Sequence, residues 1–108
     1  MVIITNKYIP FKGFSAMNVC GILFVREGER ISDTMLNHES IHTAQMKETS
    51  YVVFYIWYVI EWLIRLVKYR NFDKAYRNIS FEREAYENER YSDYLDSRKK
   101  FAWLKYLK

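Results

Sequence analysis

The chain has 108 residues, enough for one small domain over residues 1–108 and too few for separate catalytic and regulatory domains. Hydrophobic residues make up 50% of it and aromatic residues 19%, with only three glycines and one proline, which excludes a disordered or low-complexity chain. The net charge is +4, but acidic residues interleave with the basic ones and the glycine-and-aromatic pattern of a nucleic-acid module is missing, which argues against nucleic acid as a partner.

Short β-prone runs separated by turn residues fill the first quarter of the chain. They cover residues 2–4, 8–11 and 17–25. These runs predict a small antiparallel sheet of two or three strands. Cys20 is the only cysteine, which excludes an intramolecular disulfide, and its apolar neighbours predict a buried, inert thiol.

A turn and a capping residue mark the start of the first helix. Residues 27–30, Glu-Gly-Glu-Arg, predict the turn. Ser32 or Asp33 can cap the helix, because either side chain can accept a hydrogen bond from a free N–H group of the first turn. We expect this helix to run from about Asp33 to about Lys47.

The segment from Tyr51 to Tyr69 is the most hydrophobic part of the chain and predicts a second helix that is apolar almost all round. Its uninterrupted apolar run covers only residues 51–60, about half of the ~20 residues that a bilayer span requires. We therefore expect this helix to be buried at the centre of the domain. Its charged side chains fall on one stripe: Glu61, Arg65 and Lys68.

A membrane surface is the alternative partner for the same segment. Trp57, Trp62 and the tyrosines between Tyr51 and Tyr69 could anchor it as a peripheral contact. The start of the chain lacks the basic region and apolar run of a secretion signal. The cytoplasm is therefore the expected compartment, with membrane association as the alternative.

The remaining residues predict a third helix and a short terminal one. After a polar connection through residues 69–78, Ser80 can cap a helix with an acidic first turn that continues to about Ser97. Apolar residues from Phe101 to Leu107 recur at helical spacing and should dock on the core. Together the elements predict an α+β fold, an N-terminal sheet of two or three strands followed by three to four helices.

His38, Glu39 and His42 form the pattern H-E-x-x-H on the first helix. Residues four apart lie on the same face of a helix, so both imidazoles can bind one zinc ion while Glu39 faces a water beside it. Zinc in catalytic sites has few protein ligands and keeps one position open. The pattern therefore predicts Zn²⁺ as the cofactor of a hydrolase in which Glu39 is the general base.

The third ligand is expected to be a carboxylate, because the chain has no other histidine and Cys20 lies among the apolar strands. The acidic cluster of residues 81–89 is its source. Glu84 lies on the more apolar face of that helix, which turns it inward. Glu82 lies beside the small Ala85, which would permit close approach to the first helix. The residues alone leave both glutamates open.

In these two motifs the chain resembles the gluzincins, zinc metallopeptidases whose third ligand is a glutamate on a later helix. In many small members that glutamate opens the motif E-x-x-A-[D/N]. Residues 82–86, Glu-Arg-Glu-Ala-Tyr, match it with Tyr86 in the final position. The resemblance implies that Glu82 is the third ligand, with Glu84 as the alternative. It also implies that Tyr86 occupies the place of a residue that orients a ligand.

The chain resembles in particular small metallopeptidase-like proteins in which a glutamine follows H-E-x-x-H, as Gln45 does here. In such enzymes an edge strand ahead of the metal helix pairs with extended substrate, and residues 21–26 take that place. The resemblance implies a zincin-like domain that hydrolyses peptide bonds in a peptide or protein substrate. A zinc-binding pseudoenzyme, or a membrane-surface interaction protein without turnover, is the alternative function.

Overall fold

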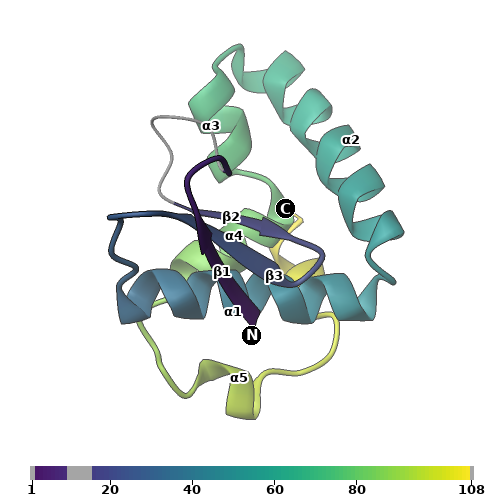
Figure 1. Cartoon of the computed structure of the whole chain (residues 1–108). Coiled ribbons are helices and arrows are strands. Elements are labelled where there is room, and N and C mark those ends of the chain that lie inside the picture. Colours follow the sequence, from purple (N-terminus) through teal and green to yellow (C-terminus); the bar gives the residue numbers. More distant parts are fainter. Residues whose placement is uncertain (1, 10–15, 108) are drawn as a thin grey trace.

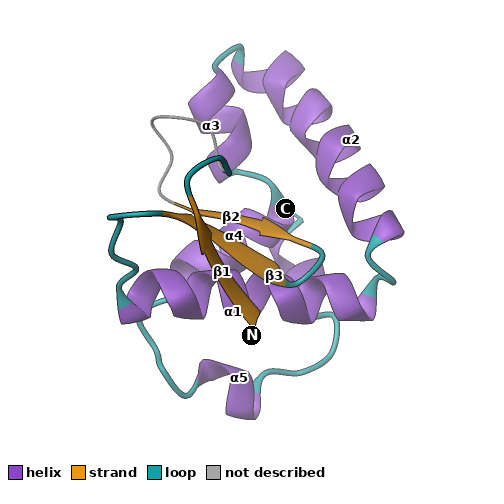
Figure 2. Ribbon diagram, in the orientation of Figure 1, coloured by secondary structure: helices purple, strands orange, loops and turns teal. Residues whose placement is uncertain are grey.

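The computed structural model describes residues 2–9 and 16–107. A three-stranded sheet lies against the first of several helices, so the predicted α+β class is confirmed (Figure 1, Figure 2). The elements are β1 (Val2–Asn6), β2 (Ala16–Val19), β3 (Ile22–Arg26), α1 (Asp33–Glu48), α2 (Val52–Tyr69), α3 (Phe72–Arg77), α4 (Ser80–Asn88), α5 (Tyr94–Ser97) and the 3-10 helix η1 (Ala102–Tyr106).

The sheet is mixed, which corrects the prediction of an antiparallel one. Its order is β1-β3-β2, with β3 parallel to β1 and antiparallel to β2. Leu23 and Val25 of β3 are 0% and 4% exposed, whereas all of β1 except its last residue is exposed. The strand with the buried side chains therefore takes the centre, where both of its backbone edges are hydrogen-bonded.

Two further N-terminal predictions need correction. Residues 8 and 9 are not in a strand. The side chain of Asn6 accepts hydrogen bonds from the backbone N–H groups of Tyr8 and Ile9, which holds these residues in a turn. The rest of the predicted strand over residues 8–11 lies outside the described residues. The run 17–25 forms two strands joined at Cys20 and Gly21, both with positive φ, as a two-residue hairpin turn requires. Because it lies in this turn, Cys20 is exposed and not buried.

Helix α1 begins as predicted. Ser32 is its N-cap and accepts a hydrogen bond from the backbone N–H of Met35. The Asn18 side chain donates to the carbonyl oxygen of Glu39 and to the hydroxyl of Thr43, which ties β2 to the middle of α1. The buried residues of α1 are His38, Ile41, His42, Gln45 and Met46.

Helix α2 lies on the outside of the molecule, so the prediction of a buried central helix is wrong (Figure 1). Only Phe54, Glu61 and Arg65 of its 18 residues are buried. The reason is that α1, α3 and aromatic side chains of α4 and η1 pack against one side of α2 and leave the rest of its circumference uncovered. No single helix in the described part of the chain has the length and composition of a membrane span; α1 and α2 pass only as a pair, bent by 111°.

The C-terminal segment completes the core, as predicted for residues 101–107. Trp103 is 4% exposed, and its ring centroid lies 4.6 Å from that of Phe81. The predicted polar connection over residues 69–78 is wrong, since it contains α3, capped by Asn71. The core cluster consists of Met46, Phe54, Ile79, Phe81 and Trp103.

Tertiary contacts set both ends of α4 and correct two predictions. Ser80 is not the N-cap but the first helical residue, and its amide and hydroxyl both donate to the carboxylate of Glu61 in α2. The helix ends at Asn88 and does not continue to residue 97. The Asn37 side chain of α1 donates to the backbone carbonyl oxygens of Glu89 and Tyr91. These carbonyls therefore have hydrogen-bond partners although the helix has ended.

Candidate metal centre

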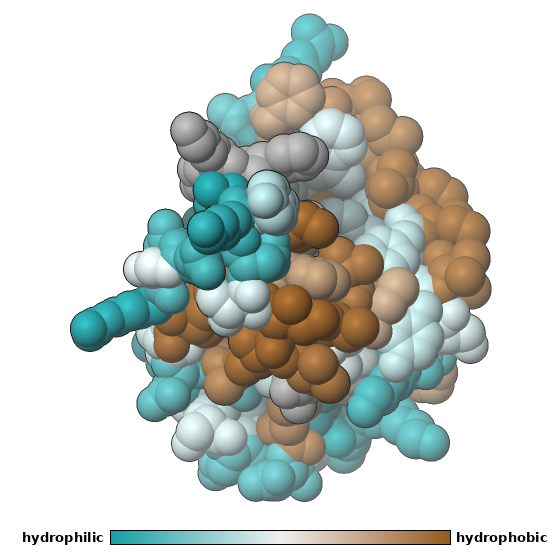
Figure 3. Space-filling view, in the orientation of Figure 1, coloured by the Kyte–Doolittle hydropathy of each residue, from teal (hydrophilic) through white to brown (hydrophobic). Residues whose placement is uncertain are grey.

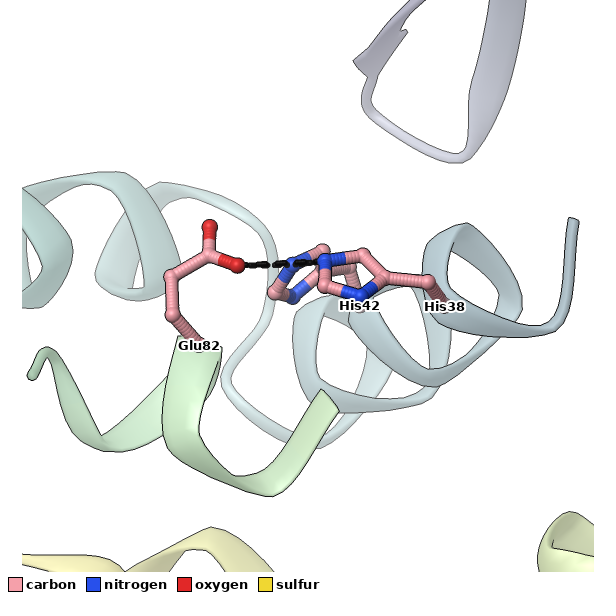
Figure 4. Close-up of side chains that lie close together, drawn as sticks. All are labelled: His38, His42 and Glu82. Atoms are coloured by element: carbon pink, nitrogen blue, oxygen red, sulfur yellow. Dashed lines mark hydrogen bonds and ion pairs between the residues drawn. The ribbon is translucent and has the colours of Figure 1, made fainter. Parts of the chain in front are cut away.

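Three side chains that could hold a metal ion meet between α1 and α4 (Figure 4). Glu82 Oε1 lies 3.1 Å from His38 Nε2 and 3.0 Å from His42 Nε2, and the two nitrogens are 3.1 Å apart. All three residues are buried. The structure therefore brings together the two histidines of the H-E-x-x-H pattern and Glu82.

Gln45 orients the imidazole of His42. Its Nε2 donates to the carbonyl oxygen of Phe81 and to Glu84, so its Oε1 is left to face His42 Nδ1, at 2.7 Å. An amide oxygen can only accept, so Nδ1 of His42 carries the proton and Nε2 presents its lone pair to the cluster. The position of Gln45 three residues after His42, on the same helix face, is the sequence signal for this role.

Glu89 orients the imidazole of His38. Its Oε2 lies 3.0 Å from His38 Nδ1, so Nδ1 of this ring donates as well. Tyr86 contacts His38 with its ring, at 4.6 Å between centroids, while its hydroxyl bonds to that of Tyr76. Sequence reasoning missed the role of Glu89, although its spacing of two helical turns from Glu82 was a signal for it.

The two candidate glutamates point in different directions. Glu82 Oε1 faces the histidines, and its Oε2 accepts a hydrogen bond of 2.6 Å from the hydroxyl of Tyr58. Glu84 is 0% exposed and accepts hydrogen bonds from Arg98, Tyr94 and Gln45, and not from the histidines. The structure thus places Glu82, and not Glu84, in the cluster.

The donor set fits a metal cation. With both Nδ1 protons committed elsewhere, the two Nε2 atoms and Glu82 Oε1 are three acceptors in mutual contact, an arrangement that only a cation or a proton can satisfy. Tetrahedral zinc, with bonds of about 2.0–2.1 Å to nitrogen and oxygen, separates its ligand atoms by about 3.3 Å. The observed separations of 3.0–3.1 Å are close to that value.

The electrostatics of the cluster also favour a positive charge. Burial lowers the pKa of His42, but the carboxylate of Glu82 outweighs burial and raises the pKa of His42 to about 9. Burial likewise raises the pKa of Glu82, but His42 and His38 outweigh it and hold this pKa well below its usual range. Burial raises the pKa of Glu39 above its ordinary value against the opposing effect of both histidines.

A cleft of about 170 Å³ borders the cluster. It gives His42, Glu82 and Glu39 an opening toward solvent, with β2 on one side and α2 on the other. The lining residues include Asn18, Glu39, His42, Tyr55, Tyr58 and Glu82.

The strand beside this cleft is not the one that the sequence predicted. β3 is hydrogen-bonded on both sides, so the expectation that residues 21–26 form a substrate-binding edge is wrong. β2 pairs only with β3 among the described residues, and its Asn18 lines the cleft. The edge strand of the site is therefore β2, because the parallel pairing with β1 moves β3 to the centre.

Glu61 of α2 holds the N-terminus of the helix that carries Glu82. Its Oε1 accepts a 2.6 Å hydrogen bond from the Ser80 hydroxyl, and its Oε2 accepts from the Ser80 amide and lies 3.5 Å from Arg65 Nη2. A carboxylate at this position satisfies a free N–H group and complements the positive end of the helix dipole. Glu61 of α2 is thus turned inward, where it positions α4.

Removing this carboxylate should destabilise the protein. Glu61→Ala would leave the Ser80 amide and the Arg65 charge without their buried partner, and we expect a loss of about 3 kcal/mol in the free energy of unfolding. Urea unfolding followed by circular dichroism measures it, with the exposed Glu29→Ala as the matched control. Equal stability of the two variants would contradict the capping role.

Comparison with known protein families, with curated proteins and with solved structures finds no match for this chain. The functional argument therefore depends on the site itself. That site is a buried group of two imidazoles and one carboxylate, from α1 and α4, which could hold a metal ion.

Proposed function

We propose that the protein is a zinc-dependent hydrolase of peptide bonds. His38, His42 and Glu82 are the zinc ligands and Glu39 is the general base. The observation that carries this proposal is the convergence of three buried acceptor atoms beside Glu39, on a cleft that opens to solvent. The ligand set of two histidines and one glutamate is that of several zinc peptidases, which supports zinc over other ions.

The side chains around the cluster have distinct tasks in this proposal. Bound zinc supplies Lewis acidity, which acidifies water and polarises a carbonyl group. The Glu39 carboxylate takes a proton from the attacking water and passes it to the leaving amine. Its pKa, raised by burial, makes it a better proton acceptor than an exposed glutamate. Gln45 and Glu89 keep the two imidazoles in the orientation that binding requires.

Tyr55 is the residue best placed to stabilise an oxyanion, a role that the sequence left open. The hydroxyl of Tyr58 is committed to Glu82. The hydroxyl oxygen of Tyr55 accepts from the amide of Cys20, and the Tyr55 hydroxyl is in weak contact with Met46 Sδ, at 4.0 Å. Because that contact is weak, the Tyr55 proton can be donated to a developing negative charge in the cleft.

An extended peptide is the substrate that the cleft fits best. β2 has a free backbone edge in the described structure and borders the cleft through Asn18. A peptide that pairs with this edge would run past the metal ligands with its backbone extended. Main-chain pairing recognises any sequence, so specificity would come from the side chains along the cleft.

Replacing the general base tests the proposal. Glu39→Gln should retain zinc and lose about 10²–10⁴-fold in kcat/KM on a mixture of fluorogenic peptides, because an amide cannot accept the proton. Tyr55→Phe should also retain zinc and lower kcat by a smaller factor. Wild-type activity in Glu39→Gln would contradict the assigned base. A zinc-loaded wild-type protein without turnover on any peptide would instead support the zinc-binding pseudoenzyme.

A further inference from the structure

Helix α2 is amphipathic in the reverse of the usual sense. Glu61 and Arg65 are only 6% and 9% exposed, whereas its aliphatic side chains face solvent. Figure 3 shows the apolar atoms gathered along α2 at the right edge of the molecule. The residues that define this apolar face are Val52, Ile56, Val59, Ile60, Ile64 and Val67, each more than half exposed.

Interior contacts hold the helix in this orientation. Glu61 binds the first residue of α4, and Arg65 donates to the carbonyl oxygen of Leu107. If the helix were rotated to bury its aliphatic side chains, these hydrogen bonds of Glu61 and Arg65 would be lost. The apolar face is therefore a fixed feature of the fold, and a contiguous apolar face of this kind marks an interaction surface.

The residues that flank the apolar face indicate what it binds. Trp57 on α2 is partly exposed, at 38%. The end of α2 and α3 carry exposed basic residues, and the only acidic residue between positions 62 and 81 is Asp73. An aliphatic band with aromatic and basic neighbours is the composition of a helix that lies in a membrane interface. The basic residues are Lys68, Arg70, Lys74 and Arg77.

We propose that the apolar face of α2 docks on an anionic lipid bilayer, with the helix in the plane of the interface. Acyl chains would take up the aliphatic side chains, and acidic headgroups would pair with Lys68, Arg70 and Lys74. A second copy of the chain would bring the same basic residues to the contact and no acidic patch to meet them. Charge complementarity therefore favours the lipid surface. The docking is independent of hydrolysis, since it uses no residue of the metal centre.

Vesicle flotation of the purified full-length protein tests this inference. The wild type should float with phosphatidylcholine vesicles that contain phosphatidylglycerol, and less with phosphatidylcholine alone. Ile60→Glu and Ile64→Glu should each lower the partition coefficient by about tenfold or more. The matched control is Tyr91→Glu, because Tyr91 is 52% exposed in the loop after α4. It should bind as the wild type does.

Fluorescence gives a second readout that needs no charged substitution. Brominated lipids should quench the wild type, and the double variant Trp57→Phe/Trp62→Phe should lose most of that quenching, because the third tryptophan, Trp103, is buried. No binding of the wild type to anionic vesicles, or equal binding by Ile60→Glu, would overturn the proposal. A lipid-free dimer that Ile60→Glu dissociates would overturn it too, by assigning the face to a second copy.

Discussion

Purified wild-type protein should contain zinc, and His38→Ala, His42→Ala and Glu82→Ala should each lose it. Each substitution removes one of the three acceptor atoms that lie 3.0–3.1 Å apart, and two remaining ligands are fewer than the three that catalytic zinc sites have. Elemental analysis after gel filtration measures the metal content. Circular dichroism of the same samples separates loss of the ion from loss of the fold.

Glu84→Gln is the decisive comparison, because Glu84 is the other glutamate that the sequence left open. Its side chain faces Arg98 and Tyr94, so we expect this variant to keep its zinc. Glu89→Gln should be intermediate, with affinity lowered about 10–100-fold, since Glu89 acts through His38. Zinc retained in Glu82→Ala but lost in Glu84→Gln would mean that the wrong glutamate had been assigned.

Arg98→Ala should destabilise the protein by about 3–5 kcal/mol, a large part of the typical total of about 5–15 kcal/mol. Arg98 donates to Glu48 of α1 at 2.8 Å and 2.9 Å, and to Glu84 of α4 at 3.0 Å. The side chains of all three residues are 8% exposed or less. Without the guanidinium, two buried carboxylates would face each other with no cation between them.

Two variants make this measurement specific. Arg90→Ala removes an exposed arginine from the same region and should change stability by less than about 0.5 kcal/mol. Arg98→Lys keeps the charge but loses the paired hydrogen bonds of the guanidinium, so its loss should lie between the two. Urea unfolding gives all three values. If Arg98→Ala were as stable as Arg90→Ala, the network would contribute no net stability.

Local sequence patterns determined the features that depend on one helix. Ser32 or Asp33 predicted the start of α1, and the structure shows that Ser32 is the cap. The spacing of His38 and His42 predicted that the two imidazoles approach one point, and their Nε2 atoms lie 3.1 Å apart. Both follow from hydrogen bonding and periodicity within a single turn of helix, which neighbouring elements do not change.

The choice between Glu82 and Glu84 needed contacts between helices. Amphipathicity favoured Glu84, but both glutamates are buried on α4, so burial alone does not identify the ligand. Arg98, which lies well beyond α4 in the sequence, pairs with the Glu84 carboxylate, which contacts α1 at Gln45 and not at the histidines. The family resemblance implied Glu82. The structure places the same residue beside the histidines, because the Arg98 guanidinium pairs with Glu84 instead.

The errors in the predicted fold have the same origin. The hydrophobicity of α2 predicted burial, but its only buried charges, Glu61 and Arg65, serve α4 and the C-terminal segment, and this turns the apolar side outward. β3 was expected at an edge and is central, because it pairs with β1 across more than a dozen intervening residues. The sequence by itself thus determined periodicity, capping and the spacing of ligands within a helix. The tertiary structure alone decided which partner satisfies each buried polar group, because that depends on residues brought together from distant parts of the chain.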